Sequence, residues 1–380
     1  MTNTYYEKDI STINTKTLQI PNDIKPLNIV SLFSGAGGMD LGFIGDFKFL
    51  DEYYDGNPYN IVFANDIFKQ AADIYEYNFK HKVETTSITD LDLNEHLPNI
   101  DVDVVLGGFP CQTFSYSGKR SGLSDPRGQL YMQMIRVLKH YKPKIFIAEN
   151  VDGIRNSKKN NVGANVDQSA LDTILEDFDE SGYDVQYRIL NSANFGVPQI
   201  RKRVIIMGIR KDLGSVEDQF YPMPTNDQFG NETGNKWLTA KDGIDDLWEN
   251  IDATVIPNHT FRDYSKAKFY PGKKMQGNNR IFPDRPAPTI RAEHHGNIEA
   301  HYRYSKEEED VTGWRRLSVR ECARLQSFPD SFNFVASASS SYKAIGNAVP
   351  PVMAWHIARA VFHTLDKLGL IEFNKQKLNG

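Results

Sequence analysis

The sequence comprises 380 residues, of which 40% are hydrophobic, 24% charged and 12% aromatic. This composition is typical of a folded globular protein and excludes a disordered chain, a collagen and a coiled coil. Lys and Arg contribute 44 positive charges against 49 negative ones from Asp and Glu, a formal net charge of −5. Because a net negative charge repels a polyanion, any nucleic-acid partner has to meet a local basic patch.

Two cysteines occur, Cys111 and Cys322. The first residues lack the basic and then apolar pattern of a signal peptide, and the apolar runs are strand-sized, too short to span a bilayer. We therefore expect a cytoplasmic protein with both thiols reduced.

From residue 28 to residue 210, short apolar runs alternate with amphipathic, helix-length segments. This alternation predicts an α/β fold: a doubly wound, mostly parallel sheet with helices on both faces. In such sheets ligands bind beyond the carboxyl ends of the strands. Strands are expected at 28–33, 60–66, 101–108, 144–150 and 203–210, and helices at 71–79 and 129–141.

After residue 210 the charge pattern changes. Residues 211–257 carry 10 acids against 3 lysines, whereas 258–303 carry 9 Lys or Arg against 4 acids. This asymmetry indicates a second, smaller module with one basic face. Helical patterns return at 318–328 and at 350–368, where two prolines precede the second helix.

A glycine-rich turn, FSGAGG, follows the first expected strand and opens a helix. Glycines there let a ligand approach the backbone, so a nucleotide-like ligand is one interpretation and a structural turn is the other. A dinucleotide fingerprint needs a further glycine at position 40, where Asp40 stands. Asp66, at the end of the next strand, either binds ribose hydroxyls or caps a helix.

Three further positions carry groups suited to catalysis. Cys111 lies on a loop directly after the strand at 101–108, where it is either a nucleophile or a small buried residue. Glu149 ends the strand at 144–150 and is either a proton donor or a capping or ion-paired acid. Arg201 and Arg203 share one face of a strand, because residues two apart point the same way. They either clamp a phosphate or a base carbonyl, or belong to a solvated edge of the sheet.

Together these segments resemble the cytosine-C5 DNA methyltransferases, of the bacterial, restriction-modification type. FSGAGG resembles the family's S-adenosylmethionine motif, GFPCQTFS its catalytic-cysteine motif, ENV its catalytic-glutamate motif and QIRKR its two-arginine motif. RECARLQSFPDSF and YKAIGNAVPP resemble the last two motifs, and all stand in the family's order. The resemblance implies the fold of an S-adenosylmethionine-dependent methyltransferase with a smaller target-recognition domain.

The resemblance also implies the reaction. Cys111 adds as thiolate to carbon 6 of a flipped-out cytosine while Glu149 protonates ring nitrogen 3. Arg203, with Arg201 as a second contact, stabilises the charge, and carbon 5 takes the methyl group. The catalytic domain is expected at 1–210 together with 340–380, and the target-recognition domain at 211–339.

Motif by motif, the resemblance implies further contacts. The family usually has an acid where Ser31 stands and another near Ser87. Asn347 resembles the family asparagine that fixes the small module against the catalytic loop, and a helix-start cap is the competing interpretation of this residue. Cys322 falls in a helical pattern, and we expect it to be inert. Cofactor contacts are expected at Phe33, Ser34, Gly35, Ala36, Gly37, Gly38, Asp66, Ile67, Ser87, Ile88, Gly108, Pro110, Asn347 and Ala348.

Double-stranded DNA is the implied partner, and no metal is expected. The basic, aromatic-rich stretch at 258–303 is expected to contact phosphates, or else is a solvated surface. A cognate restriction endonuclease sharing the target sequence and a monomeric enzyme are further expectations by analogy. DNA contacts are expected at Gln112, Ser115, Lys266, Lys268, Lys273, Lys274, Arg280, Arg285, Thr289, Ile290 and Arg291.

Three other functions compete with this interpretation. An RNA (tRNA) cytosine methyltransferase shares the thiolate chemistry, but has a shorter middle module and usually a Cys-Phe-Thr signature that this sequence lacks. A nicotinamide dehydrogenase uses a glycine loop but does not need Cys111, Glu149 and the arginine pair together. A catalytically silent DNA-binding module retains the same residues as scaffold only.

Overall fold

The structure is a computed structural model of the chain. It describes residues 11–96, 99–110, 130–156, 169–252, 255–263, 280–292, 302–303 and 315–374.

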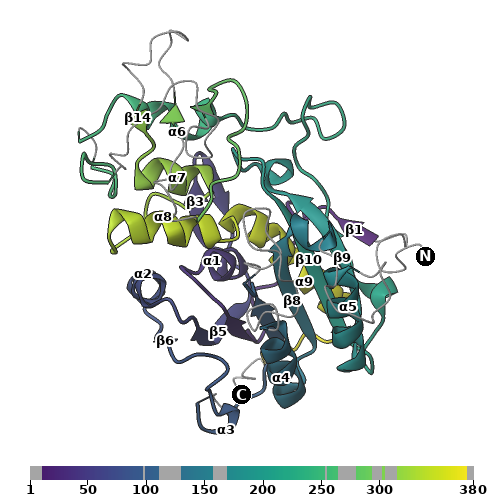
Figure 1. Cartoon of the computed structure of the whole chain (residues 1–380). Helices are drawn as coiled ribbons and strands as arrows, with labels where there is room; N and C mark the ends of the chain where they lie inside the picture. Colours follow the sequence, from purple (N-terminus) through teal and green to yellow (C-terminus); the bar gives the residue numbers. More distant parts are fainter. Residues whose placement is uncertain are drawn as a thin grey trace, which may run out of the picture.

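A seven-stranded sheet forms the centre of the molecule (Figure 1). Its strands are parallel except β10, which runs antiparallel to both of its neighbours, β8 and β9. The expected mostly parallel sheet is therefore confirmed. In spatial order the strands are β6 (Val83–Glu84), β5 (Tyr59–Asn65), β2 (Leu27–Leu32), β7 (Val104–Gly107), β8 (Ile145–Val151), β10 (Lys202–Arg210) and β9 (Tyr183–Asn191).

Both faces of this sheet are buried, which explains why its strands read as continuous apolar runs. On β8, Ile145 and Ile147 belong to one hydrophobic cluster, whereas Phe146 and Ala148 belong to the other. The same alternation divides the residues of β2, β7 and β10 between the two clusters, because successive side chains of a strand point to opposite faces.

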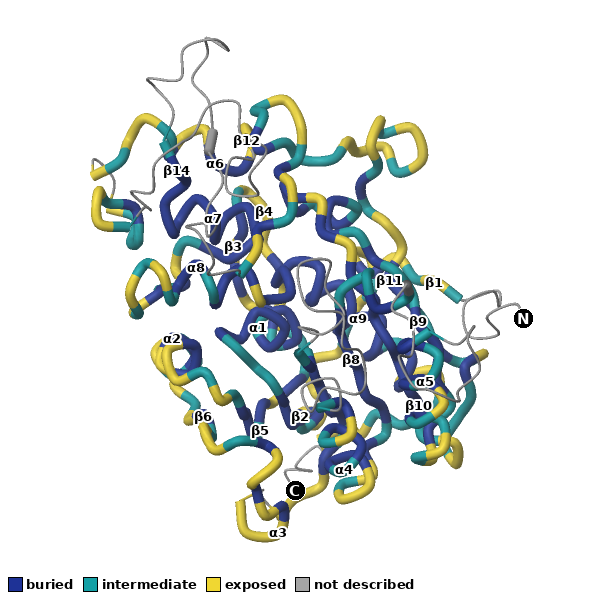
Figure 2. The backbone as a smooth tube through the Cα atoms, viewed as in Figure 1, coloured by how far each residue is buried: buried dark blue, intermediate teal, exposed yellow. Residues whose placement is uncertain are grey.

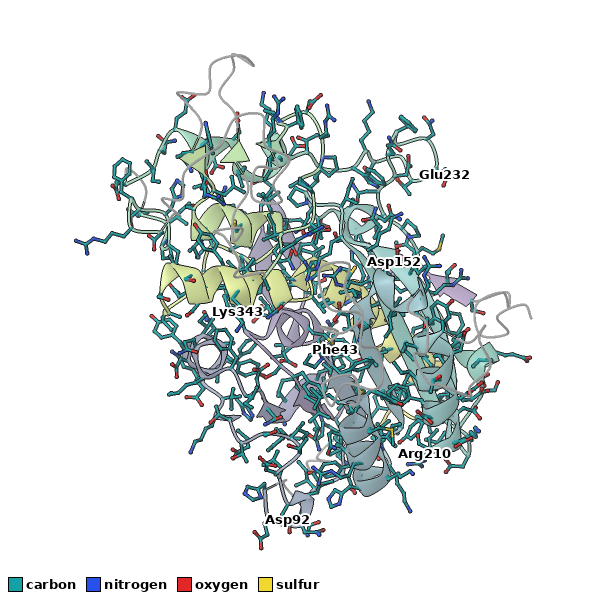
Figure 3. All side chains as sticks on the ribbon, in the orientation of Figure 1. Phe43, Asp92, Asp152, Arg210, Glu232 and Lys343 are labelled. Atoms are coloured by element: carbon teal, nitrogen blue, oxygen red, sulfur yellow. The ribbon has the colours of Figure 1, made fainter. Side chains whose placement is uncertain are left out.

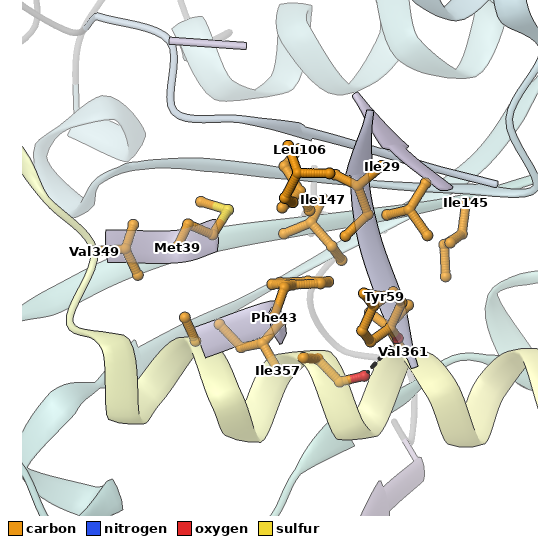
Figure 4. Close-up of a cluster of buried hydrophobic side chains, with 14 of the residues drawn as sticks. Ile29, Met39, Phe43, Tyr59, Leu106, Ile145, Ile147, Val349, Ile357 and Val361 are labelled. Carbon is orange, nitrogen blue, oxygen red and sulfur yellow. Dashed lines mark hydrogen bonds between the residues drawn. The ribbon is translucent and has the colours of Figure 1, made fainter. Parts of the chain in front are cut away.

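Helices cover both faces, as the sequence predicted. One cluster joins the sheet to α4 and α5, the other to α1 and α9. In the second cluster the hydroxyl of Tyr59 donates to the carbonyl of Ala358 at 2.8 Å (Figure 4). The helices are α4 (Tyr131–Tyr141), α5 (Ala170–Glu180), α1 (Gly38–Ile44) and α9 (Pro351–Lys367), and α2 (Lys69–Phe79) follows β5.

A third hydrophobic cluster includes residues of α8 and of α7, and these two helices lie side by side (Figures 1 and 2). It also includes Ala36 of the glycine turn and Ala71 and Ile74 of α2, so this part of the chain is packed directly onto the sheet domain. Its elements are α6 (Ala240–Trp248), α7 (Val319–Leu325), α8 (Ala338–Asn347) and a small sheet of β12 (Arg280–Ile281), β13 (Tyr302–Arg303) and β14 (Arg315–Arg316).

Shorter elements complete the described chain. β11 pairs with β1 and packs against α9, so the beginning of the range 211–339 lies with the sheet domain. Within the described ranges, no helix has the length and apolarity that crossing a membrane requires. The shorter elements are β1 (Ser11–Ile13), β3 (Phe47–Phe49), β4 (Glu52–Tyr54), α3 (Leu93–His96), the 3₁₀ helices η3 (Asp152–Asn156), η4 (Ser192–Phe195) and η5 (Val216–Asp218), and β11 (Phe220–Pro222).

Candidate active site

The candidate residues meet at one edge of the sheet. The parallel strands β2, β5, β7 and β8 all end at this edge, and antiparallel β10 begins there. The glycine turn, Asp66, Gly108, Glu149 and Arg203 are consequently brought together although they are far apart in the sequence.

The glycine turn after β2 is tight on one side and open on the other. Phe33, Gly35 and Gly37 have φ angles of 54°, 56° and 84°, so the backbone winds through the left-handed region. A Cβ added at Gly37 would lie 2.3 Å from the ring of Phe79, whereas one added at Gly35 would meet nothing within 4 Å. The turn is thus packed against α2 through Gly37 and has free space at Gly35.

Asp66 holds this turn from the neighbouring strand. Its carboxylate accepts the backbone N–H of Gly35 at 2.8 Å and that of Phe68 at 2.7 Å. Burial raises the pKa of Asp66 above its usual range, and these two hydrogen bonds oppose the shift. The N-cap position of α2 belongs to Phe68, so Asp66 lies two residues before the cap. The adjacent Ile67 is 71% exposed.

Glu149 and Arg203 form a buried ion pair. Arg203 Nε lies 2.7 Å from Glu149 Oε1, and each side chain is 10% exposed. Ile205 is the residue directly opposite Glu149 in the antiparallel pair β8–β10, which places Arg203 diagonally on the same face. The sequence identified both residues, but only this register shows that they are partners.

The same strand end holds the loop that leads to the candidate nucleophile. A Cβ added at Gly108 would lie 3.4 Å from Glu149 Oε2, and Asn150 Nδ2 donates to the carbonyl of Phe109 at 3.2 Å. Glu149 therefore lies beside the backbone only three residues before Cys111. Cys111 itself lies outside the described residues, as do Gln112 and Ser115.

Arg201 has a different environment from Arg203. It is 1% exposed and donates to the carbonyls of Ile290 at 2.9 Å and Gly346 at 2.7 Å. Burial and the like charge of Arg203 both lower the pKa of Arg201. Because its guanidinium is directed at backbone carbonyls, we place Arg201 as a positioning residue.

The remaining expected cofactor residues lie beside β5 and at the end of α8. Asn65 Nδ2 donates to the carbonyls of Glu84 and Thr86 and so holds the segment of Ser87 and the buried Ile88 beside β5. Asn347 is exposed at the last residue of α8, and the N-cap of α9 is Pro350, so the helix-start interpretation of Asn347 is wrong.

Next to Asn347, Ala348 packs against the start of α1. A Cβ added at Gly38 would lie 3.0 Å from the Cβ of Ala348. The structure thereby brings the last motif of the sequence onto the first one.

The described residues of the expected DNA-binding segment lie next to the two-arginine motif. Thr289 Oγ1 donates to the carbonyl of Ile200 at 2.8 Å, Ile290 is fully buried and Arg291 is exposed. Arg280 and Arg285 lie over the Phe282 ring, at 5.4 and 4.3 Å from its centroid. Lys266, Lys268, Lys273 and Lys274 are outside the described residues.

Comparison with known proteins identifies the family. The family described as C-5 cytosine-specific DNA methylase matches residues 27–363. The chain belongs to this family. It is 34% identical to the Type II methyltransferase M.FnuDI of Fusobacterium nucleatum, covering 89% of this chain and 95% of the relative. It is 35% identical to the Type II methyltransferase M.NgoFVII of Neisseria gonorrhoeae, covering 93% of this chain and 89% of the relative.

Solved structures show the same fold. The Dnmt2 methyltransferase of S. pombe superposes with a TM-score of 0.62 at 21% identity, and the methyltransferase EhMeth of Entamoeba histolytica with 0.61 at 18%. Each comparison covers 90% of this chain and 99% of the other. The protein is therefore a DNA cytosine-5-methyltransferase with a methyltransferase fold.

The site fits S-adenosylmethionine, the methyl donor that the family implies. The turn offers free space at Gly35, its backbone is fixed by Asp66, and Ala348 packs against its last residue, Gly38. Among the described residues, no three His, Cys, Asp or Glu side chains are grouped as metal ligands.

Three further residues near this site carry no role in the motif pattern of the sequence. Asn150 anchors the loop at Phe109, Gln199 joins several segments, and Asp40 lies fully buried beneath the turn. Asn150 and Gln199 stood inside quoted motifs, but their buried partners lie far away in the sequence. Asp40 had a usable signal, because a carboxylate among apolar helix residues is rarely buried without a reason.

Proposed function

We propose that the enzyme transfers the methyl group of S-adenosylmethionine to carbon 5 of a flipped-out cytosine in a specific duplex sequence, through a covalent Cys111–carbon 6 adduct. The observation that carries this proposal is the buried Glu149–Arg203 pair beside Gly108. The carboxylate and the guanidinium of this pair lie next to the backbone that leads into Cys111. Of the two cysteines in the sequence, Cys111 is the one that follows a strand of the central sheet.

The residues divide the chemistry between them. The Cys111 thiolate adds to carbon 6 and forms the S–C bond, while Glu149 donates a proton to ring nitrogen 3, so that the electron pair is drawn toward carbon 5. Arg203 holds Glu149 in place and offsets the negative charge of the thiolate. Carbon 5 then takes the methyl group. A base removes the carbon 5 proton, the S–C bond breaks to restore the Cys111 thiolate, and ring nitrogen 3 returns its proton to Glu149.

The cofactor supplies an electrophilic methyl group on its sulfonium. The residues that would hold it are the turn at 33–38 with Asp66, Ile67, Ser87, Ile88, Gly108, Pro110, Asn347 and Ala348. An acid is not needed at Ser31 for this arrangement, because Asp66 already fixes the turn.

Duplex DNA is the proposed substrate. A stacked cytosine is inaccessible at carbon 6, so the base has to be flipped out at a cost of a few kcal/mol. We assign the offsetting phosphate contacts to the target-recognition domain at 211–339, with the catalytic domain at 1–210 and 340–380. The proposed contacts are Gln112, Ser115, Lys266, Lys268, Lys273, Lys274, Arg280, Arg285, Thr289, Ile290 and Arg291.

The names of the relatives support a proposal for the biological role. M.FnuDI and M.NgoFVII are Type II methyltransferases by name. We propose that this chain likewise protects host DNA in the cytoplasm, as a monomer, against an endonuclease that cuts the same sequence.

Methylation of random-sequence duplex DNA with labelled S-adenosylmethionine tests the proposal, because sequencing the methylated cytosines gives the target. Cys111→Ala should abolish transfer while duplex binding persists, and retained transfer would remove Cys111 from the reaction. A 5-fluorocytosine at the target should trap an adduct on Cys111. Methylation of tRNA with none on duplex DNA would favour the RNA enzyme instead.

A further inference from the structure

The turn between α8 and α9 (residues 346–349) comprises the last two residues of α8 and the two that follow, and its backbone contacts two expected ligand-binding segments. On one side, a Cβ added to Gly346 would lie 2.4 Å from the backbone nitrogen of Ala292, in the expected DNA-binding segment. On the other, a Cβ added to Gly38 of the cofactor turn would lie 2.4 Å from the carbonyl oxygen of Val349. No side chain fits at either contact, so movement of one segment displaces the other.

Two buried glutamines join the same segments. The Ile290 N–H donates to Gln199 Oε1 at 2.9 Å, and Gln199 Nε2 donates to Gln326 Oε1 at 2.5 Å. Gln326 Nε2 in turn donates to the carbonyl of Ala348 at 2.6 Å. Both glutamines are 0% exposed. An uninterrupted chain of hydrogen bonds thus runs from the DNA-binding segment to the turn, in surroundings where an unpaired amide is costly.

Arg201 provides a second, independent connection. Its Nη1 donates to the carbonyl of Ile290 and its Nη2 to that of Gly346. Both backbone groups of Ile290 are therefore fixed, its N–H through the glutamines to Ala348 and its carbonyl through Arg201 to Gly346.

We infer that the turn at 346–349 couples the two sites, so that S-adenosylmethionine and DNA each raise the affinity of the enzyme for the other. A ligand that orders the turn lowers the entropy cost of ordering the DNA-binding segment, and the effect is reciprocal by thermodynamic linkage. Gln326 is a positioning residue in this scheme, since it acts through Ala348. The inference rests on the proposed function, which supplies the two ligands.

The test measures the coupling itself rather than activity. The dissociation constant of S-adenosylhomocysteine, which does not turn over, is measured by calorimetry with and without a saturating duplex of the identified target sequence. For the unaltered enzyme we expect the duplex to tighten binding about 5-fold or more, within the usual range of coupling energies. In Gln326→Met, which keeps the side-chain length without its hydrogen bonds, the ratio should fall, and only the part carried by Arg201 should remain.

Gln186→Met is the matched control. Gln186 is a 3% exposed glutamine on β9 whose Nε2 donates to the Val216 carbonyl at 3.0 Å, outside this network. It should lose stability as Gln326→Met does but keep the coupling. Equal coupling in Gln326→Met and the unaltered enzyme would overturn the inference.

A second measurement needs no variant. S-adenosylhomocysteine alone should slow hydrogen exchange of the amides at 287–292 in the unaltered enzyme, and unchanged exchange there would also overturn the inference. If both ligands bind and DNA is methylated but the coupling ratio is one, the inference fails and the proposed function stands. If no duplex is methylated, the proposed function fails first.

Discussion

Arg203 and Glu149 form a buried ion pair across two antiparallel strands, with Nε 2.7 Å from Oε1. Each charge is isolated from water and stabilised by the other, so removing either partner leaves a buried charge uncompensated. The pair also fixes the direction of the carboxylate, whose second oxygen lies beside Gly108. The arrangement presents a positioned acid to the loop that continues into Cys111.

We predict that Glu149→Gln lowers the rate of methyl transfer by about 10²- to 10⁴-fold, the usual contribution of a positioned proton donor. The glutamine oxygen can still accept from Arg203, so the fold and the dissociation constant of S-adenosylhomocysteine should change little. Single-turnover transfer of labelled methyl groups measures the effect. Asp152→Asn is the control: Asp152 follows β8 and pairs with Arg155 but is 34% exposed, and its variant should keep the normal rate (Figure 3). Equal rates for both variants would contradict the role of Glu149.

The two glycines of the cofactor turn should respond differently to alanine. Gly35→Ala adds a methyl group to open space at a positive φ, so it should cost about 1 kcal/mol of stability but weaken cofactor binding about tenfold or more. Gly37→Ala forces a methyl group against Phe79 and Tyr75 and should cost about 1–3 kcal/mol more. Urea unfolding and calorimetric titration separate the two effects. A Gly35→Ala enzyme with unchanged cofactor affinity would place the ligand elsewhere.

Asp40 should make stability depend on pH. Burial raises its pKa to about 7, although the hydroxyls of Ser31 and Tyr75 oppose the shift. Within the described residues, no hydrogen bond of normal geometry reaches either carboxylate oxygen. Between the unfolded pKa of about 3.9 and the folded value, the native state retains a proton that the unfolded chain releases, so Asp40 costs up to about 1.4 kcal/mol of stability per pH unit as pH rises.

Asp40→Asn removes this titration while keeping the shape of the side chain. The free energy of unfolding of Asp40→Asn should therefore increase relative to that of the unaltered enzyme from pH 5 to pH 8, as measured by urea unfolding at each pH. A difference that is constant over this range would show that Asp40 does not titrate there.

Cys322 should be unreactive in the folded enzyme. It is 0% exposed in α7, and burial raises the pKa of its thiol well above the usual value. Since thiolates are the reactive form, a Cys111→Ala enzyme should show no labelling by a thiol reagent when folded and one labelled thiol when unfolded. Cys322→Ala should retain methyl transfer. Rapid labelling of folded Cys111→Ala would contradict the burial of Cys322.

Much of the fold was predictable because it depends on local pattern. The predicted strands at 28–33, 60–66, 101–108, 144–150 and 203–210 are confirmed as β2, β5, β7, β8 and β10. Strands buried on both faces must be apolar throughout, and this is visible in a few residues. The sequence missed β9, an edge strand whose apolar residues are interrupted by polar ones such as Asp184, Gln186 and Arg188.

The local pattern of residues is enough to show which chemical groups stand at the strand ends, since the turn, Asp66, Glu149 and Arg203 each follow or open an apolar run. Which of these groups are partners depends on the folded arrangement of the chain. Gln199 and Gln326 are 127 residues apart, and Arg201 is 145 residues from Gly346. Such contacts depend on strand register and on how two hydrophobic clusters pack together, whereas the pattern of neighbouring residues reports only local geometry and burial.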